Sequence, residues 1–289
     1  FFLNRYYNQM DKTAIYYDIN YSKSVGSLKM DLYEPSLDSV DSKHRFPLLV
    51  FVHGGFWMDR DKSEYTSLGR FWASQGLMVA IVNYRLSKKA HKTPVHYPSH
   101  NNDLSAAIRW LITNHQDYRY DINNINLMGH SCGAHMVSMI TLQQQHYLHA
   151  NTNDPLPPFK ITRVIGIQGI FDNVQLEKDF PSYLENIQFV YNTDDRTQWE
   201  SPQQIIACTD QDNSLVTSTA WMLVHAPTDE WVNSIQSHNF AKRLLEHWKC
   251  QDVRVFEDLT GAHFEVVVQL GEPDHSSLNG LRQTIKEYI

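Results

Sequence analysis

The residues Gly129 to Gly133 read GHSCG and form the pattern G-x-S-x-G, with Ser131 at its centre. The mainly apolar residues 125–128 precede this pattern as a predicted buried strand, and a predicted helix follows it. Glycines on both sides of a serine permit the sharp strand-to-helix turn that lifts a serine oxygen clear of a sheet. Ser131 is therefore our candidate nucleophile.

A serine hydroxyl is a weak nucleophile at neutral pH and needs a base and an orienting carboxylate. Asp229 lies just after the predicted strand 221–225, and His263 lies after the predicted strand 253–257. Both follow the chain order of nucleophile, acid and histidine, at strand ends where catalytic groups collect in open α/β sheets. We prefer Asp229 as the acid, with Glu230 as its rival, and His263 as the base.

The residues HGGFW follow the predicted strand 47–52, where backbone donors are needed to stabilise a tetrahedral oxyanion. We assign these donors to Gly54 and Gly55 and to the amide of Cys132, the residue after the nucleophile. A tight turn that buries its aromatic side chains in the core is the plainer interpretation of the same five residues.

Other chemistry fits these residues less well. Cys132 lies beside the candidate nucleophile, but this position in the turn is wrong for attack by its thiol. His130, Cys132 and His135 lack the spacing of structural zinc ligands. The glycines match neither the dinucleotide-binding nor the nucleotide-phosphate motif. We therefore expect no metal and no cofactor.

The elements that must position these residues alternate between strand and helix. Short apolar runs predict strands at 47–52, 78–83, 125–128, 163–168, 221–225 and 253–257. Helices are expected at 63–75, 103–115 with Asp103 as its cap, 138–148, 238–248 and 277–289, and an antiparallel strand pair at 14–21 and 28–33. The pattern predicts an α/β fold with a mostly parallel central sheet and helices on both faces.

Residues 171–215 break this alternation and form a predicted irregular insertion over the active site, because long irregular segments in compact domains are usually functional. The chain contains no repeat of 20–50 residues and no long linker. We therefore predict that residues 1–289 form a single domain.

Composition limits the partners. The 25 Lys and Arg residues against 32 Asp and Glu give a net charge of −7, which argues against nucleic acid. The apolar runs are too short to cross a membrane. Three widely spaced cysteines, Cys132, Cys208 and Cys250, favour a reducing compartment. We expect a cytoplasmic protein that acts on a small molecule, and we leave open a homodimer and a leader before Phe1.

The motifs, in their order along the chain, resemble those of serine hydrolases with the α/β-hydrolase fold. Within that fold, the chain is similar to the kynurenine formamidase (arylformamidase) group, whose members pair an HGG-x-W loop with GHS-x-GAH. Likeness to the fungal members extends to YRLS at 84–87, to GIF at 169–171 followed by FPSY at 180–183, and to LVHAPTDE at 223–230.

This resemblance implies hydrolysis of N-formyl-L-kynurenine to L-kynurenine and formate, with Ser131 as nucleophile, Asp229 as acid and His263 as base. Four aromatic residues are candidates for binding the substrate's aryl ring: Phe56, Trp57, Tyr183 and Phe189. A carboxylesterase, including a prenylcysteine methylesterase-like enzyme, would use the same catalytic residues with a different pocket. A non-catalytic binding member of the fold is a further alternative, although no triad residue is missing. No residue is assigned to the amino-acid head of the substrate.

Overall fold

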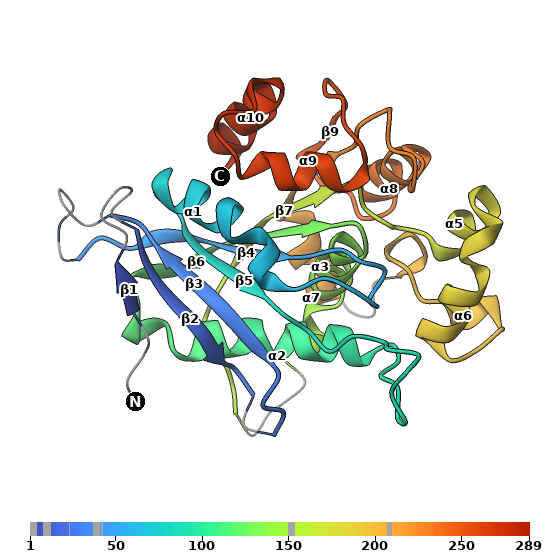
Figure 1. Ribbon diagram of the computed structural model, residues 1–289, viewed down its shortest axis with the longest axis horizontal. Helices are drawn as coiled ribbons and strands as arrows, with labels where there is room; N and C mark the ends of the chain where they lie inside the picture. The colour runs from blue at the N-terminus through green and yellow to red at the C-terminus, as the bar shows by residue number, and fades with distance from the viewer. Residues whose placement is uncertain are drawn as a thin grey trace.

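The computed structural model describes residues 5–7, 13–22, 24–36, 41, 43–149, 154–206 and 210–289 (Figure 1). A nine-stranded sheet runs through it in the order β1-β2-β3-β5-β4-β6-β7-β8-β9. The strands are β1 (Arg5–Tyr7), β2 (Ala14–Asn20), β3 (Lys29–Glu34), β4 (Phe46–Val52), β5 (Met78–Val82), β6 (Tyr120–His130), β7 (Ile161–Ile167), β8 (Ala220–Val224) and β9 (Val253–Phe256).

The sheet is antiparallel from β1 to β5 and parallel from β5 to β9. This confirms the predicted antiparallel opening pair and the mostly parallel sheet. The central strands β4 and β5 are apolar along nearly their whole length because helices cover both of their faces.

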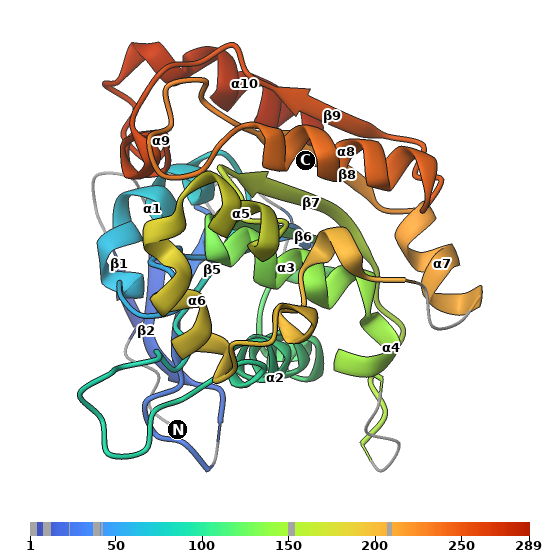
Figure 2. The ribbon, with the colours of Figure 1, turned by 90° about the vertical axis from the view of Figure 1, so that its right-hand side faces the viewer.

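Two layers of helices enclose the sheet (Figures 1 and 2). Apolar side chains of α1, α9 and α10 pack on one face, and those of α2, α3 and α8 pack on the other. The helices are α1 (Thr66–Ser74), α2 (Ser99–Thr113), α3 (Cys132–Leu142), α4 (Gln144–Tyr147), α5 (Asn173–Asp179), α6 (Leu184–Tyr191), α7 (Asp210–Thr217), α8 (Ile235–Glu246), α9 (His263–Leu270) and α10 (Asn279–Tyr288).

Two helices begin earlier than the sequence predicts. Helix α3 starts at Cys132 rather than at residue 138, and every one of its side chains is buried, so it lacks the one-sided apolar pattern of a surface helix. Helix α2 starts at Ser99, which places Asp103 inside it. The prediction that Asp103 caps this helix is wrong, because its carboxylate instead accepts hydrogen bonds from the Arg85 side chain and backbone amide.

Helix α9 is not predicted by the sequence, since its core HFEVVVQL is short and rich in β-branched residues. It begins at His263, so the candidate base occupies the first turn of a helix. The segment 171–215 is more regular than expected, since it contains α5, α6 and the start of α7, with short 3-10 turns between them. In Figure 1 the α5–α6 pair lies at the right-hand end of the molecule, beyond α3.

Across the described ranges, no helix combines the length and the apolar character needed to cross a bilayer. Cys132 and Cys250 are buried free thiols, and Cys208 lies outside the described residues.

Candidate active site

The register of the parallel strands brings the loops of interest to one edge of the sheet. Val52 at the end of β4 pairs with Gly129 of β6, and the next residue, His130, pairs with Ile167 of β7. Val224 at the end of β8 then pairs with both Ile167 and Phe256 of β9. The residues that follow these strands, including Gly54, Ser131, Asp229 and His263, therefore leave the sheet at the same edge.

Ser131 occupies a strained turn between β6 and α3. Its φ of 54° and ψ of −120° place a non-glycine residue in a sparsely populated region. The flanking glycines make this turn possible: a Cβ at Gly129 would lie 2.4 Å from the carbonyl carbon of Gly133, and a Cβ at Gly133 would lie 2.2 Å from the Val52 oxygen. The Ser131 amide donates to the Ile167 oxygen at 2.9 Å, which fixes the turn to β7.

The structure brings Asp229 and His263 into direct contact. Nδ1 of His263 lies 2.8 Å from Oδ2 of Asp229, and both side chains are almost completely buried. The other oxygen, Oδ1, accepts hydrogen bonds from the amides of Trp231 and Val232, at 2.8 and 3.1 Å. The carboxylate is therefore held by its own loop in an orientation that keeps a proton on Nδ1 of His263 and leaves Nε2 to act as a base.

Glu230, the rival acid, plays a different part. Its Oε2 accepts a hydrogen bond from the backbone amide of His263 at 3.1 Å, and no contact joins it to the imidazole among the described residues. This carboxylate helps to anchor the first turn of α9, where acidic groups are favoured.

His130, next to the candidate nucleophile, links the two catalytic loops. Its Nε2 lies 2.8 Å from the backbone oxygen of His263, and the two rings are 4.7 Å apart between centres. Burial, with the charge of His263, holds the pKa of His130 well below its usual value, so the ring is neutral and donates from Nε2 to the carbonyl. The candidate base His263 is thus held at its side chain by Asp229 and at its backbone by His130.

The HGGFW loop passes against the Ser131 turn. A Cβ at Gly54 would lie 2.6 Å from Nδ1 of His130 and 2.9 Å from Cβ of Ser131, so a glycine is required for this approach. Gly55 has a φ of +104° and lies next in the loop. In the part of the chain that the structure describes, no backbone oxygen outside the helices and strands accepts a hydrogen bond from the amides of Gly55 and Cys132.

The Cys132 thiol points into the protein rather than toward a substrate. Its Sγ accepts a hydrogen bond from the Trp57 amide at 3.1 Å and lies 3.6 Å from the Tyr84 hydroxyl. Burial raises the pKa of this thiol to about 11, so it is not ionised at neutral pH. This fits the expectation that the Cys132 thiol is not the attacking group.

The four aromatic candidates have different environments. Trp57 is fully buried and packs edge-on against His135 and Tyr191, which is a core position. Phe189 contacts His96 and Lys89 of the loop after β5, and among the described residues none of the triad candidates. The structure therefore favours a packing role for both.

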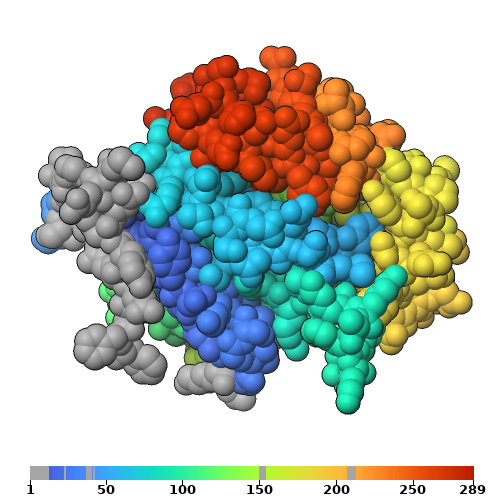
Figure 3. Space-filling model, viewed as in Figure 1, coloured from blue at the N-terminus to red at the C-terminus, as the bar shows by residue number. Residues whose placement is uncertain are grey.

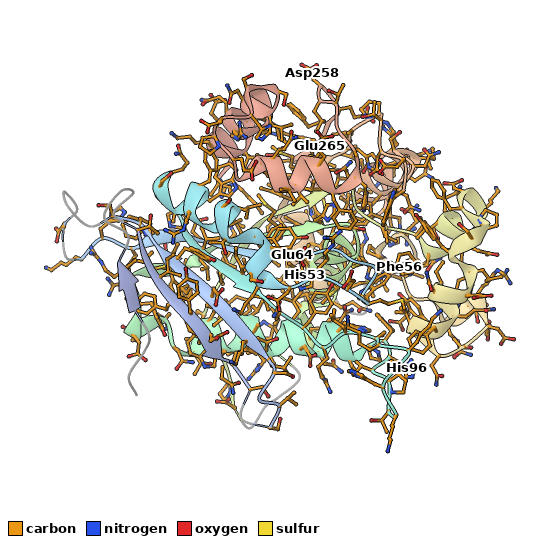
Figure 4. The ribbon with its side chains drawn as sticks, viewed as in Figure 1. His53, Phe56, Glu64, His96, Asp258 and Glu265 are labelled. Atoms are coloured by element: carbon orange, nitrogen blue, oxygen red, sulfur yellow. The ribbon has the colours of Figure 1, made fainter. Side chains whose placement is uncertain are left out.

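Phe56 and Tyr183 lie closer to the candidate triad. Their ring centres are 5.2 Å apart, and Figure 4 shows Phe56 on the side of its loop that faces the α5–α6 segment. Burial, with the negative charges of Asp229 and Glu230, raises the pKa of Tyr183, which places its hydroxyl within electrostatic reach of both carboxylates. These two residues remain candidates for contacting a substrate.

Sequence reasoning overlooked Trp231. Its ring lies nearly parallel to the His263 imidazole, with centres 5.7 Å apart and an interplanar angle of 10°, and 43% of the residue is exposed. An exposed tryptophan stacked on a catalytic histidine is a ready contact for an aromatic substrate. The available signal was its place two residues after Asp229, but the spacing alone did not show which way its ring points.

Within the described ranges, no three His, Cys, Asp or Glu side chains gather so that they could hold a metal ion.

Comparisons with known proteins show the family and the fold. Residues 30–244 match the BD-FAE family. Kynurenine formamidase avaC from Aspergillus versicolor is 26% identical over 264 residues, which cover 82% of this chain and 89% of that protein. A probable isoprenylcysteine alpha-carbonyl methylesterase from rice is 33% identical over 40% of this chain and 26% of its own. The solved structure of esterase B from Lactobacillus rhamnosis superposes with a TM-score of 0.68 at 18% identity, over 98% of this chain and 88% of that one.

Proposed function

Because the chain belongs to the BD-FAE family and is a hydrolase with the α/β-hydrolase fold, we propose that it hydrolyses N-formyl-L-kynurenine to L-kynurenine and formate. The observation that carries this proposal is the 2.8 Å contact between Nδ1 of His263 and Oδ2 of Asp229, at the sheet edge that also holds the Ser131 turn. Likeness to a kynurenine formamidase over most of both chains supports the choice of substrate.

In this mechanism Oγ of Ser131 attacks the formyl carbon while Nε2 of His263 accepts the hydroxyl proton. The negative charge that develops on the formyl oxygen is stabilised by amides of the Gly54–Gly55 stretch and of Cys132. Asp229 stabilises the positive charge on the imidazole. The carbon–nitrogen bond breaks as His263 gives the proton to the departing arylamine, which leaves a formyl ester on Ser131.

A water molecule then attacks this ester. His263 accepts a proton from the water and returns it to Oγ of Ser131, so that formate is released and the enzyme is restored. A formyl group has only a hydrogen beyond its carbonyl carbon. The close approach of Gly54 to Ser131 is compatible with a small acyl group.

The test compares kcat/KM for N-formyl-L-kynurenine with kcat/KM for short p-nitrophenyl esters, in the wild type and in Ser131→Ala. Ser138→Ala is a matched control, because Ser138 lies on the same helix and is also buried. We expect efficient formamide cleavage that disappears in Ser131→Ala and persists in Ser138→Ala.

A carboxylesterase is the second candidate, and the rice methylesterase relative favours it. Fast ester hydrolysis with negligible formylkynurenine turnover would support this alternative and reject the formamidase. It would leave the assignment of Ser131, Asp229 and His263 in place, because both reactions use the same steps.

A further inference from the structure

Arg60 lies at the end of the HGGFW loop, in an unusual conformation. Its φ of 81° is in the left-handed region, where a residue with a side chain is strained. The stem of its side chain packs against Gly55, since a Cβ on that glycine would lie 2.8 Å from Cγ of Arg60. The loop that supplies candidate oxyanion donors therefore also fixes the position of a guanidinium group.

The guanidinium has unused hydrogen-bonding capacity. Nη1 donates to Oε2 of Glu64 at 2.8 Å, and the other Glu64 oxygen accepts from the Asp61 amide at 3.0 Å. Among the described residues this is the one hydrogen bond that the Arg60 side chain makes, and 34% of the side chain is exposed. Arg85, by contrast, has its Nε and Nη2 groups bound to Asp103.

Arg60 adjoins the side of His263 where a leaving group must lie. Its Cζ is 4.1 Å from the centre of the Phe264 ring, whose centre is 5.1 Å from that of His263. Trp231 stacks on His263 and meets Phe264 edge-on at 5.3 Å. In the proposed reaction His263 hands its proton to the departing atom, so a leaving group next to its imidazole can contact the wall formed by Trp231 and Phe264.

The segment that contains Arg60 reaches the surface of the molecule. Figure 3 shows the segment that contains the HGGFW loop and Arg60 between the C-terminal helices and the α5–α6 region. In Figure 4, Glu64 lies below the helix α9 that carries Glu265. The Arg60–Glu64 pair thus lies at the edge of the α9 region, on the surface and open to water.

We infer that Arg60 binds a carboxylate carried by the leaving group of the substrate, at the far end of the wall formed by Phe264 and Trp231. The planar fork of an arginine matches a carboxylate with two parallel hydrogen bonds. Its existing pair with Glu64 is partly exposed and therefore weak, so a substrate carboxylate can share or replace it at little cost. This inference rests on the proposed hydrolase function and names the leaving-group class that the site selects.

The first test uses two substrate pairs that differ in charge. N-formyl-L-kynurenine is compared with 2-formamidoacetophenone, which keeps the formyl-arylamine and lacks the amino-acid tail. 3-(4-Acetoxyphenyl)propanoate is compared with its N-methylamide, which has a neutral tail on the same leaving phenol. Each is measured with the wild type, Arg60→Gln and Arg60→Lys, and with Arg196→Gln as a control, because Arg196 is another exposed arginine paired with one glutamate.

We expect Arg60→Gln to raise KM for the carboxylate members by roughly 10- to 100-fold, as for loss of a charge-assisted hydrogen bond. For the neutral members, the rise in KM should be at least tenfold smaller. The KM of Arg60→Lys for the carboxylate substrates should lie between those of the wild type and Arg60→Gln. The KM values of Arg196→Gln should equal those of the wild type. An equal rise in KM for the charged and the neutral substrates, or no rise for either, would overturn the inference.

A second measurement needs no variant that alters the loop. 3-Phenylpropanoate should inhibit the wild-type enzyme more strongly than 3-phenylpropanamide, and an equal effect of the two would also overturn the inference. If the wild type hydrolyses the ester pair but neither formamide, the formamidase proposal fails. The ester pair and the inhibitors then still decide the role of Arg60.

Discussion

The Nε2 atom of His225 lies 3.6 Å from Oδ2 of Asp229, the oxygen that also accepts the hydrogen bond from His263. Nε2 of His225 donates to the Val232 oxygen at 2.9 Å, and Nδ1 accepts from the Ser237 hydroxyl at the same distance. Burial lowers the pKa of His225, so this second histidine is neutral. It supports the acid loop without competing for the charge of Asp229.

Replacement of His225 by Gln should therefore lower kcat by about tenfold, as for residues that orient a catalytic ligand from behind. The KM should change little, because His225 is buried away from substrate. The acidic limb of the pH profile of kcat/KM should stay at the same pH, because replacing a neutral histidine removes no charge. A shift of that limb would mean that His225 is charged in the native enzyme.

Asp229→Asn should reduce kcat by about 10⁴-fold, because an amide no longer holds the required tautomer of His263. Glu230→Gln is the matched control. Among the described residues, the hydrogen bond that Glu230 makes is to the backbone amide of His263, so we expect a loss of less than about tenfold. Steady-state kinetics of the two variants decide between these acids, and a larger loss in Glu230→Gln would reverse our assignment.

Gly54→Ala should reduce kcat by at least about 100-fold, the effect of losing an oxyanion donor. The added methyl group would overlap His130 and Ser131, which forces the loop and its amides away from the nucleophile. Gly26→Ala is the control, since a Cβ there meets nothing within 4 Å. Circular dichroism should show both variants folded. Full activity in folded Gly54→Ala would remove this loop from the oxyanion site.

The buried histidines predict a loss of stability at mildly acidic pH. Burial lowers the pKa of His135 to about 4 and that of His100 to about 3, whereas both titrate near 6.5 when unfolded. Between these values the unfolded chain binds protons that the native protein excludes, so stability is complete above pH 6.5 and falls as the pH drops. Each histidine contributes up to about 1.4 kcal/mol per pH unit.

Urea unfolding at pH 7.5, 6 and 5 measures this dependence. His135→Gln should reduce the slope in that range, because its replacement does not titrate. The exposed His238 is half accessible and pairs with Glu257, so His238→Gln is expected to leave the slope nearly unchanged. An identical slope in His135→Gln and the wild type would contradict the prediction.

The parts of the site that depend on local covalent geometry were predictable from the sequence. The Ser131 turn follows from glycines whose Cβ atoms would collide with backbone, and the strands follow from short apolar runs. The meeting of Asp229 with His263 was expected from strand order alone. Roles inferred for these residues stay predictions until the variants are measured.

Features set by tertiary packing were not predictable. From the sequence alone, Trp57 is equally suited to the core and to a substrate pocket. Its contacts with His135 and Tyr191 place it in the core. The apolar residues of helix α9 do not form a one-sided pattern strong enough to predict a helix. His225 is one of 15 histidines, and nothing in its neighbours along the chain indicates that it approaches Asp229.

The segment from Gly54 to Arg60 contains both the candidate oxyanion donors and the group inferred to select the substrate, while Ser131 sits on the separate, rigid β6–α3 junction. A change of substrate preference made at Arg60 therefore alters the same stretch that contains the candidate oxyanion donors. Because the Arg60 side chain packs against Gly55, substitutions at Arg60 that displace Gly55 should be selected against. Diversification of such an enzyme should proceed by exchange of this stretch as a whole rather than by single replacements within it.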